Sequence, residues 1–426
     1  MGFNSTHALG RQTKASVQNE VVFGAGPAVV SNLRWVPGDS VTALGAPTVE
    51  TTQERKVRAD ARQSRSAIEI IRGVKSNSVT LRSYVLPPLV PGTNAVNPSS
   101  GLPDVAPLLK GFFGVETINA ATVVYSLSNA QNVPPSVTAL FEYNGVKSDL
   151  IKGWVIEEWR LSIPNGEEPT FEFTGPARQQ ILTGAATSTA NASVSATSHT
   201  ITLAITAESR LFEVGSIFTY GAVASPFEVT AVNHTTGVLT ITNADDASVA
   251  SIILVTDLLI TPFSAYAEAV GINGIEPATL VSCVNGKIDL GADNDITFQS
   301  CEITGKQGNS EIRPGFTDLV SDFNPGYREI TGTITFWVRG PDILKAMGNP
   351  RYIELAGVNG KSLDITLGGD TTGDGQLDIA IPIAHLDFAS ADLPDGEAGT
   401  VQVPFTCLAT DLTAEDEITL TYSLTP

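Results

Sequence analysis

Paired carboxylates are the first residues in this sequence that could do chemistry. Glu157-Glu158 and Glu167-Glu168 each offer two neighbouring acids, the residue type that glycosidases use as proton donor and as nucleophile or base. Adjacent residues of a strand point to opposite faces, so Glu157 and Glu158 cannot share one site. Glu167 and Glu168 follow an Asn-Gly turn signal, where solvation is the default. Both pairs are predicted to be surface residues, and we expect no enzymatic activity.

A second candidate is an acidic segment that resembles a calcium loop. Asp370, Asp374 and Asp378 take positions 1, 5 and 9 of such a loop, and Gly375 takes position 6. Position 12 is Ile381, where a bidentate Glu belongs, and strand-like runs flank the segment instead of helices. We therefore predict a glycine-rich hairpin, and the three aspartates remain a weak candidate for a metal site. The four histidines lack ligand spacing, and we expect no cofactor.

The cysteines give no sign of a metal site or a disulfide framework. There are three, and none is in a C-x-x-C pair. Buried, reduced thiols are the favoured interpretation. A bridge between Cys283 and Cys301 stays open at this point.

Charge excludes several function classes and singles out one segment. The chain has a formal net charge of −20, which argues against binding to nucleic acid or to anionic membranes. No apolar run reaches the roughly 18 to 20 residues of a membrane helix, so no membrane insertion is expected. By contrast, six Lys or Arg residues fall between Arg55 and Arg72. This basic segment could contact nucleic acid or the acidic surface of another copy, and we predict the second. The candidate subunit-interface residues are Arg55, Lys56, Arg58, Arg62 and Arg65.

The elements that must position these residues are mainly strands. Apolar and polar residues alternate in many short runs, and Asn-Gly or Asp-Gly pairs separate several of them, as in β-hairpins. Helical signals are few, the clearest being Asp104 to Phe113 and Asp342 to Met347. The sequence therefore predicts a mainly β protein.

A faint internal repeat gives the order of these elements in two parts of the chain. Each part has a strand, a short helix, a strand, a hairpin with Gly-Glu and a further strand. The first set is Ser76 to Leu81, Leu108 to Gly114, Glu157 to Ile163 and Asn165 to Phe173. The second set is Thr331 to Phe336, Ile343 to Gly348, Ile381 to Phe388 and Asp395 to Val403.

A compositional break separates the two parts. Residues Ile181 to Ser198 are rich in Ala, Ser and Thr, and several short strand patterns follow up to about Thr256. We predict three units: a first repeat at 1–180, a small inserted β domain at 181–262 that projects outward, and a second repeat at 263–426.

Several of these segments resemble one known family. Pro103 to Gly114, Gly153 to Phe173, Arg328 to Val338 and Asp395 to Leu408 resemble the major tail tube proteins of long-tailed, siphovirus-like bacteriophages, in particular those with two tube folds in tandem. The resemblance implies a β-sandwich or barrel in each repeat, with one short helix packed against it. The two helices would be Val105 to Phe113 and Ile343 to Met347. It further implies an inner sheet that joins its neighbours in a ring of six tube folds.

The resemblance also implies partners and a place. Two folds per chain give homotrimeric, pseudo-hexameric rings that stack into a tube, with a homohexamer as the alternative. The expected partners are further copies of the chain and other tail proteins, such as the tape measure and the terminator. Such a protein is made in the host bacterial cytoplasm and resides in the virion tail. Its tube is the conduit for DNA ejection into the host.

Two further expectations concern the channel and the inserted domain. DNA would pass through the lumen without specific binding, and an acidic bore would repel its phosphates. The alternative function is that of a surface β-protein that binds glycans through residues 181–262.

Overall fold

The computed structural model is mainly β, as predicted. It describes residues 13–24, 34–36, 38–40, 48–54, 69–88, 102–128, 135–143, 147–182, 191–195, 199–215, 217–220, 223–243, 260–262, 281, 283, 286–291, 298–313, 320–337, 360–368, 375–387, 390–392, 399–411 and 413–424. Within these ranges the strands form one 19-stranded sheet, one 6-stranded sheet and one 2-stranded sheet. The described strands form large antiparallel sheets and do not close into a barrel.

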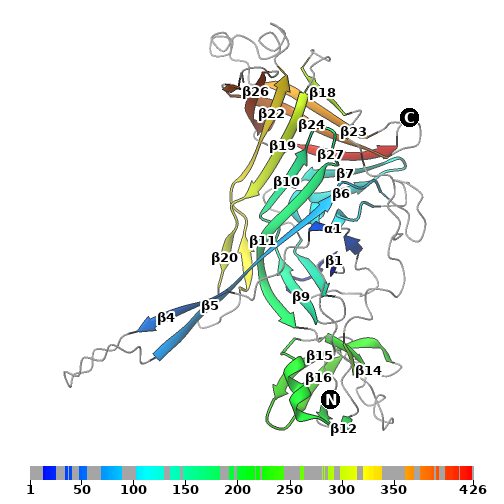
Figure 1. Ribbon diagram of the computed structural model, residues 1–426, viewed down its shortest axis with the longest axis vertical. Coiled ribbons are helices and arrows are strands. Elements are labelled where there is room, and N and C mark those ends of the chain that lie inside the picture. The colour runs from blue at the N-terminus through cyan, green and yellow to red at the C-terminus, as the bar shows by residue number, and fades with distance from the viewer. Residues whose placement is uncertain are drawn as a thin grey trace, which may run out of the picture.

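The large sheet takes strands from both ends of the chain (Figure 1). From the N-terminal part come β1 (Thr13–Asn19), β2 (Arg34–Val36), β3 (Gly38–Ser40), β4 (Thr48–Glu54), β5 (Glu69–Tyr84), β6 (Gly114–Ile118), β7 (Thr122–Leu127), β8 (Val137–Tyr143), β9 (Lys147–Trp154), β10 (Glu158–Ile163) and β11 (Thr170–Leu182). From the C-terminal part come β18 (Lys287–Leu290), β19 (Phe298–Gln307), β22 (Arg328–Trp337), β23 (Lys361–Gly368), β24 (Gly375–Leu386), β25 (Ser390–Asp392), β26 (Thr400–Leu408) and β27 (Thr419–Leu424).

The 6-stranded sheet is built from the middle of the chain alone and lies at one end of the molecule in Figure 1. Lys152 of β9, which is almost fully buried, contacts Glu228 of this sheet at 3.4 Å. This separate sheet has the strands expected for an inserted module, whose boundaries at 181 and 262 remain a prediction. Its strands are β12 (Asn191–Ser195), β13 (Thr200–Leu203), β14 (Ile217–Tyr220), β15 (Val223–Asn233), β16 (Val238–Asn243) and β17 (Ile260–Pro262), with the 3-10 helix η3 (Thr206–Leu211) after β13.

Helix α1 (Ala106–Phe113) confirms the first of the two predicted helices. Pro107 stands in its first turn, where no backbone N–H donor is needed. Gly114 ends it with φ of +86°, and a Cβ there would lie 2.4 Å from the Ser128 hydroxyl. Every residue of the helix except Lys110 is buried. The second predicted helix, Ile343 to Met347, lies outside the described residues.

One apolar core joins the two ends of the chain. It contains residues of α1 and of strands from β1 to β27, and the largest fully buried side chains are those of Trp154 and Trp159. All three cysteines are free thiols, so the bridge between Cys283 and Cys301 that sequence left open does not form. Burial raises the pKa of Cys283 to about 11 and that of Cys407 to about 12, and it also raises the pKa of Cys301.

Candidate functional site

The candidate site is a continuous run of six strands that crosses from the N-terminal to the C-terminal part of the chain. Its strand order is β5–β11–β10–β19–β22–β26, and all neighbours are antiparallel. At its centre β10 pairs with β19, from Glu158 opposite Lys306 to Ile163 opposite Cys301. Strands more than a hundred residues apart in sequence are thus joined edge to edge.

The two faces of this sheet differ completely in chemistry. Because successive strand residues alternate between faces, the pairing registers define which side chains stand in one row. On one face, Leu81, Phe173, Trp159, Gly305 and Ile330 form one row across five strands. The apolar side chains of this row are buried in the core. The opposite face carries polar side chains at nearly every position.

We call this second face the polar face. Its first row is Thr80, Thr174, Glu158, Lys306 and Glu329; its second row is Arg82, Glu172, Arg160, Thr304, Thr331 and Thr406; its third row is Tyr84, Thr170, Ser162, Glu302, Thr333 and Pro404; its fourth row is Ser300, Thr335 and Gln402. Threonine is the commonest residue in these rows. Its branched side chain suits a pleated strand, and its hydroxyl can be solvated without a net charge.

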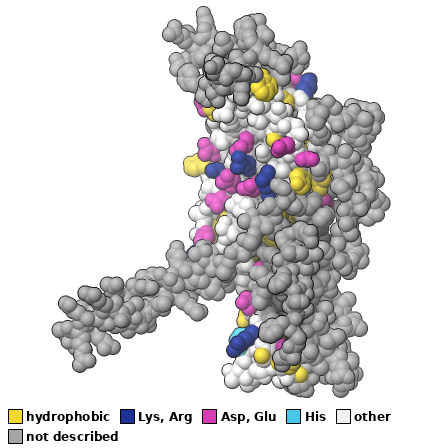
Figure 2. Space-filling view, in the orientation of Figure 1, with side chains coloured by type: hydrophobic (Ala, Val, Ile, Leu, Met, Phe, Trp, Pro, Cys, Tyr) yellow, Lys and Arg dark blue, Asp and Glu magenta, His cyan; other side chains and the backbone are white. Residues whose placement is uncertain are grey.

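Charges on the polar face are paired across strands. Arg160 of β10 lies 2.6 Å from Glu302 of β19, and Lys306 of β19 lies 3.5 Å from Glu158 of β10. The hydrogen bond to Glu302 raises the pKa of Arg160. Acidic and basic side chains are also interspersed over the central part of the surface in Figure 2. Four carboxylates on the face (Glu158, Glu172, Glu302, Glu329) stand against three cations (Arg82, Arg160, Lys306), so the face is close to neutral.

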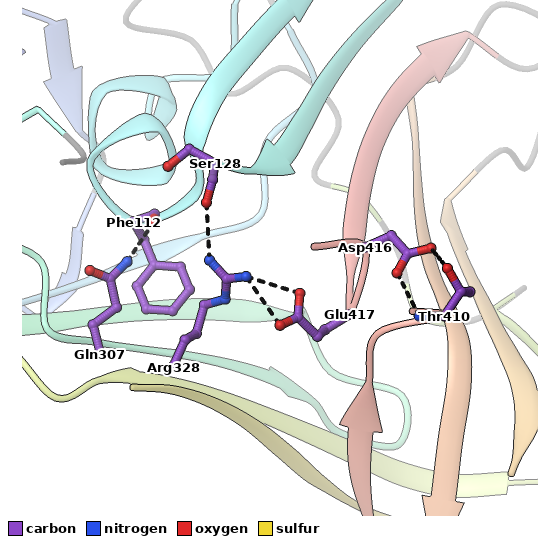
Figure 3. A network of polar contacts seen from close by, with 7 residues as sticks. All are labelled: Phe112, Ser128, Gln307, Arg328, Thr410, Asp416 and Glu417. Carbon is purple, nitrogen blue, oxygen red and sulfur yellow. Dashed lines mark hydrogen bonds and ion pairs between the residues drawn. The ribbon is translucent and has the colours of Figure 1, made fainter. Parts of the chain in front are cut away.

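The buried face holds the sheet against α1. Trp159 packs on Phe112 and Phe113, with ring centroids 5.8 and 5.4 Å away. A Cβ on Gly305 would lie 2.2 Å from the Trp159 indole nitrogen, so the glycine makes room for this ring. Gln307, at the end of β19, donates a 2.6 Å hydrogen bond to the Phe112 carbonyl at the end of the helix (Figure 3). The junction strand β19 is therefore fixed to the helix of the other part.

A second polar link ties β22 to the outer strands. Arg328, the first residue of β22, binds both carboxylate oxygens of Glu417 at 3.1 and 3.0 Å (Figure 3). Its other terminal nitrogen donates to the Ser128 carbonyl, which follows β7, at 3.4 Å. Both side chains of the ion pair are only about one fifth exposed, at 19% and 20%. A single guanidinium nitrogen thus bridges both carboxylate oxygens in a charge-assisted contact.

The strands on either side of the junction have the same pairing pattern. We call β3, β5, β11 and β10 the first unit, and β19, β22, β26 and β25 the second unit. In the first unit, β10 forms a hairpin with β11 and pairs Ser162 with Thr170. In the second unit, β25 precedes β26 and pairs Asp392 with Thr400, with a connection of the same length. The outer neighbours are β5 beside β11 and β22 beside β26.

Even the irregularities coincide. β3 pairs Gly38 with Ser83 and Ser40 with Arg82, so one residue of β3 is bulged. β19 pairs Phe298 with Phe336 and Ser300 with Thr335, and again one residue is bulged. Bulges are specific features of a strand pair, so a shared position is informative.

Each unit also has an irregular segment just before its hairpin, which we call the break: Val155–Glu157 in the first unit and His385–Asp387 in the second. The hydrogen bonds of the two breaks match. Between β9 and β10, the Glu157 N–H donates to the Thr174 carbonyl at 2.9 Å. Between β24 and β25, the Asp387 N–H donates to the Pro404 carbonyl, also at 2.9 Å. Pairing thus aligns Asp387 with Glu157 and β25 with β10. The predicted repeat sets Ile381 to Phe388 opposite β10, whereas strand pairing places β25 there.

An arm of the second unit covers the break of the first unit. β20 (Ser310–Ile312) and β21 (Asp322–Asn324) form a two-stranded hairpin between β19 and β22. Val320 and Phe323 of this arm form a small apolar cluster with Val155 and Phe23, and the two phenylalanine rings lie 5.6 Å apart. The Gln307 N–H donates to the Glu157 carbonyl at 2.7 Å. Burial raises the pKa of Glu157, and the charges of Glu158 and Glu311 raise it further.

The two carboxylate pairs of the sequence, Glu157-Glu158 and Glu167-Glu168, do not form a shared site. Glu158 is on the polar face beside Lys306, whereas Glu157 lies in the break under the arm. Glu167 and Glu168 are exposed in the turn between β10 and β11, as predicted.

The acidic segment resembling a calcium loop connects β23 to β24, which pair as the predicted hairpin. Asp378 lies in β24 and accepts hydrogen bonds from Thr366 and Gln376. Asp370 and Asp374 lie outside the described residues, as do Arg55, Lys56, Arg58, Arg62 and Arg65 between β4 and β5. No cluster of potential metal ligands occurs in the part of the chain that the structure describes.

Comparison with known proteins adds no relative: no protein-family model and no curated protein sequence matches this chain. Among the residues with described structure, no helix is long and apolar enough to cross a membrane.

Proposed function

We propose that this chain is a structural virion protein that assembles into stacked rings, forming the tail tube of a long-tailed bacteriophage. The observation that carries the proposal is the β10–β19 junction. It joins two four-strand units, β3–β5–β11–β10 and β19–β22–β26–β25, that share hairpin length, bulge position and break. These coincidences support a tandem duplication. They also support a ring of chains, because the strand junction found within one chain can be repeated between neighbouring chains.

The size of such a wall fits three chains. Eight strands per chain place about 24 strands in a trimeric ring, and at ~4.8 Å spacing and ~40° tilt the backbone circle is about 50 Å across. Side chains reduce the bore to roughly 40 Å, which still admits a DNA duplex. Six such chains would double the circumference, so the strand count supports the pseudo-hexameric trimer over the homohexamer.

The polar face supplies a suitable lining. Hydroxyl groups and neutralised ion pairs offer phosphate no cluster of free cations, so little counterion release is available to hold DNA in place. The wall proposed here is close to charge-balanced, in place of the acidic bore that net charge suggested. The opposite face is already occupied by α1 and the core, which leaves the polar face as the one directed to the channel.

Electron microscopy of the purified full-length chain tests the proposal. We expect rings or tubes with threefold symmetry and an open centre, and a mass of three chains for the smallest closed species. Mass photometry over a dilution series provides the stoichiometry independently. Dispersed monomers at high protein concentration, or closed globular dimers without a hole, would contradict the proposal.

A further inference from the structure

The first unit has an arm that pairs with no strand outside itself among the described residues. β4 and the first half of β5 pair with each other from Thr48–Ser76 to Glu54–Glu69, and with no other described strand. Figure 1 shows this hairpin, which we call the β4–β5 arm, running away from the body of the molecule. The arm of the second unit, β20–β21, occupies the corresponding place between β19 and β22 but lies against the body.

The surface that each arm should cover differs in exposure between the two units. In the first unit, Val155 is 9% exposed beneath the β20–β21 arm, where it packs with Val320 and Phe323. Strand pairing aligns Val155 with His385 of the second unit. There His385 and Asp387 are exposed. The uncovered break at 385–387 is the matching acceptor for an arm.

We infer that the β4–β5 arm of one chain lies over the break at His385–Asp387 of a second copy, as the β20–β21 arm lies over Val155–Glu157 within the chain. The inference rests on the proposed function, because a head-to-tail ring repeats the junction between neighbouring chains. Around such a ring, the second unit of one chain is followed by the first unit of the next chain. The arm of that first unit then meets the free break of the second unit.

Charge favours the same partner. In the sequence, the connection from β4 to β5 is basic, with five Lys or Arg residues between Arg55 and Arg65, while the break presents the exposed Asp387 in a chain of net charge −20. Opposite charges across a contact select the correct partner and register.

Photo-crosslinking tests the contact directly. A benzophenone amino acid at position 385, in a mixture of unlabelled and 15N-labelled full-length chains, should give mixed-isotope crosslinks to residues 48–76. The same probe at Val214, an exposed residue near the 6-stranded sheet, is the control and should give no crosslinks to that segment. Crosslinks from 385 that stay within one chain, or that reach other segments only, would overturn the inference.

A charge reversal gives a second readout. Asp387→Lys should raise the concentration needed for assembly by about tenfold or more, since like charges then face each other. Glu213→Lys, on an exposed side chain near the 6-stranded sheet, should leave that concentration unchanged. Wild-type chain that remains monomeric overturns both proposals. Normal assembly of Asp387→Lys overturns the arm contact alone.

Discussion

Arg160 and Glu302 are 142 residues apart in sequence and form a 2.6 Å ion pair across the β10–β19 junction. Both side chains are nearly half exposed, at 46% and 43%, so the pair itself contributes little to stability, typically about 0–1 kcal/mol. Its importance is positional. It neutralises a cation on the polar face at the point where two parts of one chain become one sheet.

The charge balance of the polar face can be tested with Thr331 and Thr333. Changing both to Lys adds two cations to a face that has three. We expect the assembled variant to retain DNA at low salt and to release it as salt rises, because each lysine neutralises a phosphate. Filter binding of assembled protein over a salt series measures this. The double change to Ser keeps the hydroxyls and should leave DNA unbound; equal retention by both variants would argue against a channel-facing role.

Gly305 tests the fit between the junction and α1. A Cβ at this position would meet both Trp159 and Phe112 at 2.2 and 2.8 Å, so Gly305→Ala should lower the free energy of unfolding by roughly 1–3 kcal/mol. Gly308→Ala is the matched control, because its nearest neighbour lies at 3.4 Å. Urea unfolding of both variants checks the prediction. Equal stability of the two would mean that Trp159 can move aside freely.

The Arg328–Glu417 pair should respond to loss of either partner. Glu417→Gln leaves a largely buried guanidinium with a neutral acceptor, and we expect a loss of about 1–2 kcal/mol in unfolding free energy. Thermal unfolding of Glu417→Gln beside Glu329→Gln, which changes an exposed acid next to Arg328 in the sequence, measures the difference. A larger loss in the control would show that the pair adds nothing specific.

Thiol and phenol groups predict how stability depends on alkaline pH. Burial raises the pKa of Cys283 to about 11 and that of Cys407 to about 12, above the ordinary value of 9.0. The unfolded chain therefore loses these protons first, so unfolding free energy should fall as pH rises above about 9. Burial also raises the pKa of Tyr125 and Tyr422, which extends the decline above pH 10. Urea midpoints between pH 7 and pH 10.5 check the sign.

The same shifts predict slow thiol chemistry in the folded protein. Because the thiolate is the reactive form, a disulfide reagent at pH 8 should label the native chain slowly and all three cysteines rapidly in urea. Rapid native labelling of Cys301 would contradict the burial described above.

Local features of this fold could be predicted from sequence, whereas the junction could not. The apolar pattern and flanking glycine predicted α1, and Asn165-Gly166 predicted the turn between β10 and β11, because both depend on neighbouring residues. The β10–β19 pairing joins distant segments, and neither strand's alternation specifies its partner. For the same reason the predicted repeat sets part of β24 opposite β10, because β24 is a longer and more regular alternating pattern than the short β25.

The polar face is visible in the sequence only as separate alternating runs. Thr331, Thr333 and Thr335 alternate with Gly332, Ile334 and Phe336, and β10 alternates charged with apolar residues in the same way. Only the registers reveal that these separate alternations align into shared rows. The net charge of −20 consequently suggested an acidic surface where the sheet is nearly balanced.

The junction between β10 and β19 has a kinetic consequence, because a single polypeptide supplies both strands. This seam forms at any dilution, with an effective concentration set by the tether and not by the amount of protein present. In the proposed ring, only the seams between chains depend on protein abundance. Half of the strand junctions in the ring therefore form within single chains. Nucleation of a ring then requires fewer encounters between molecules.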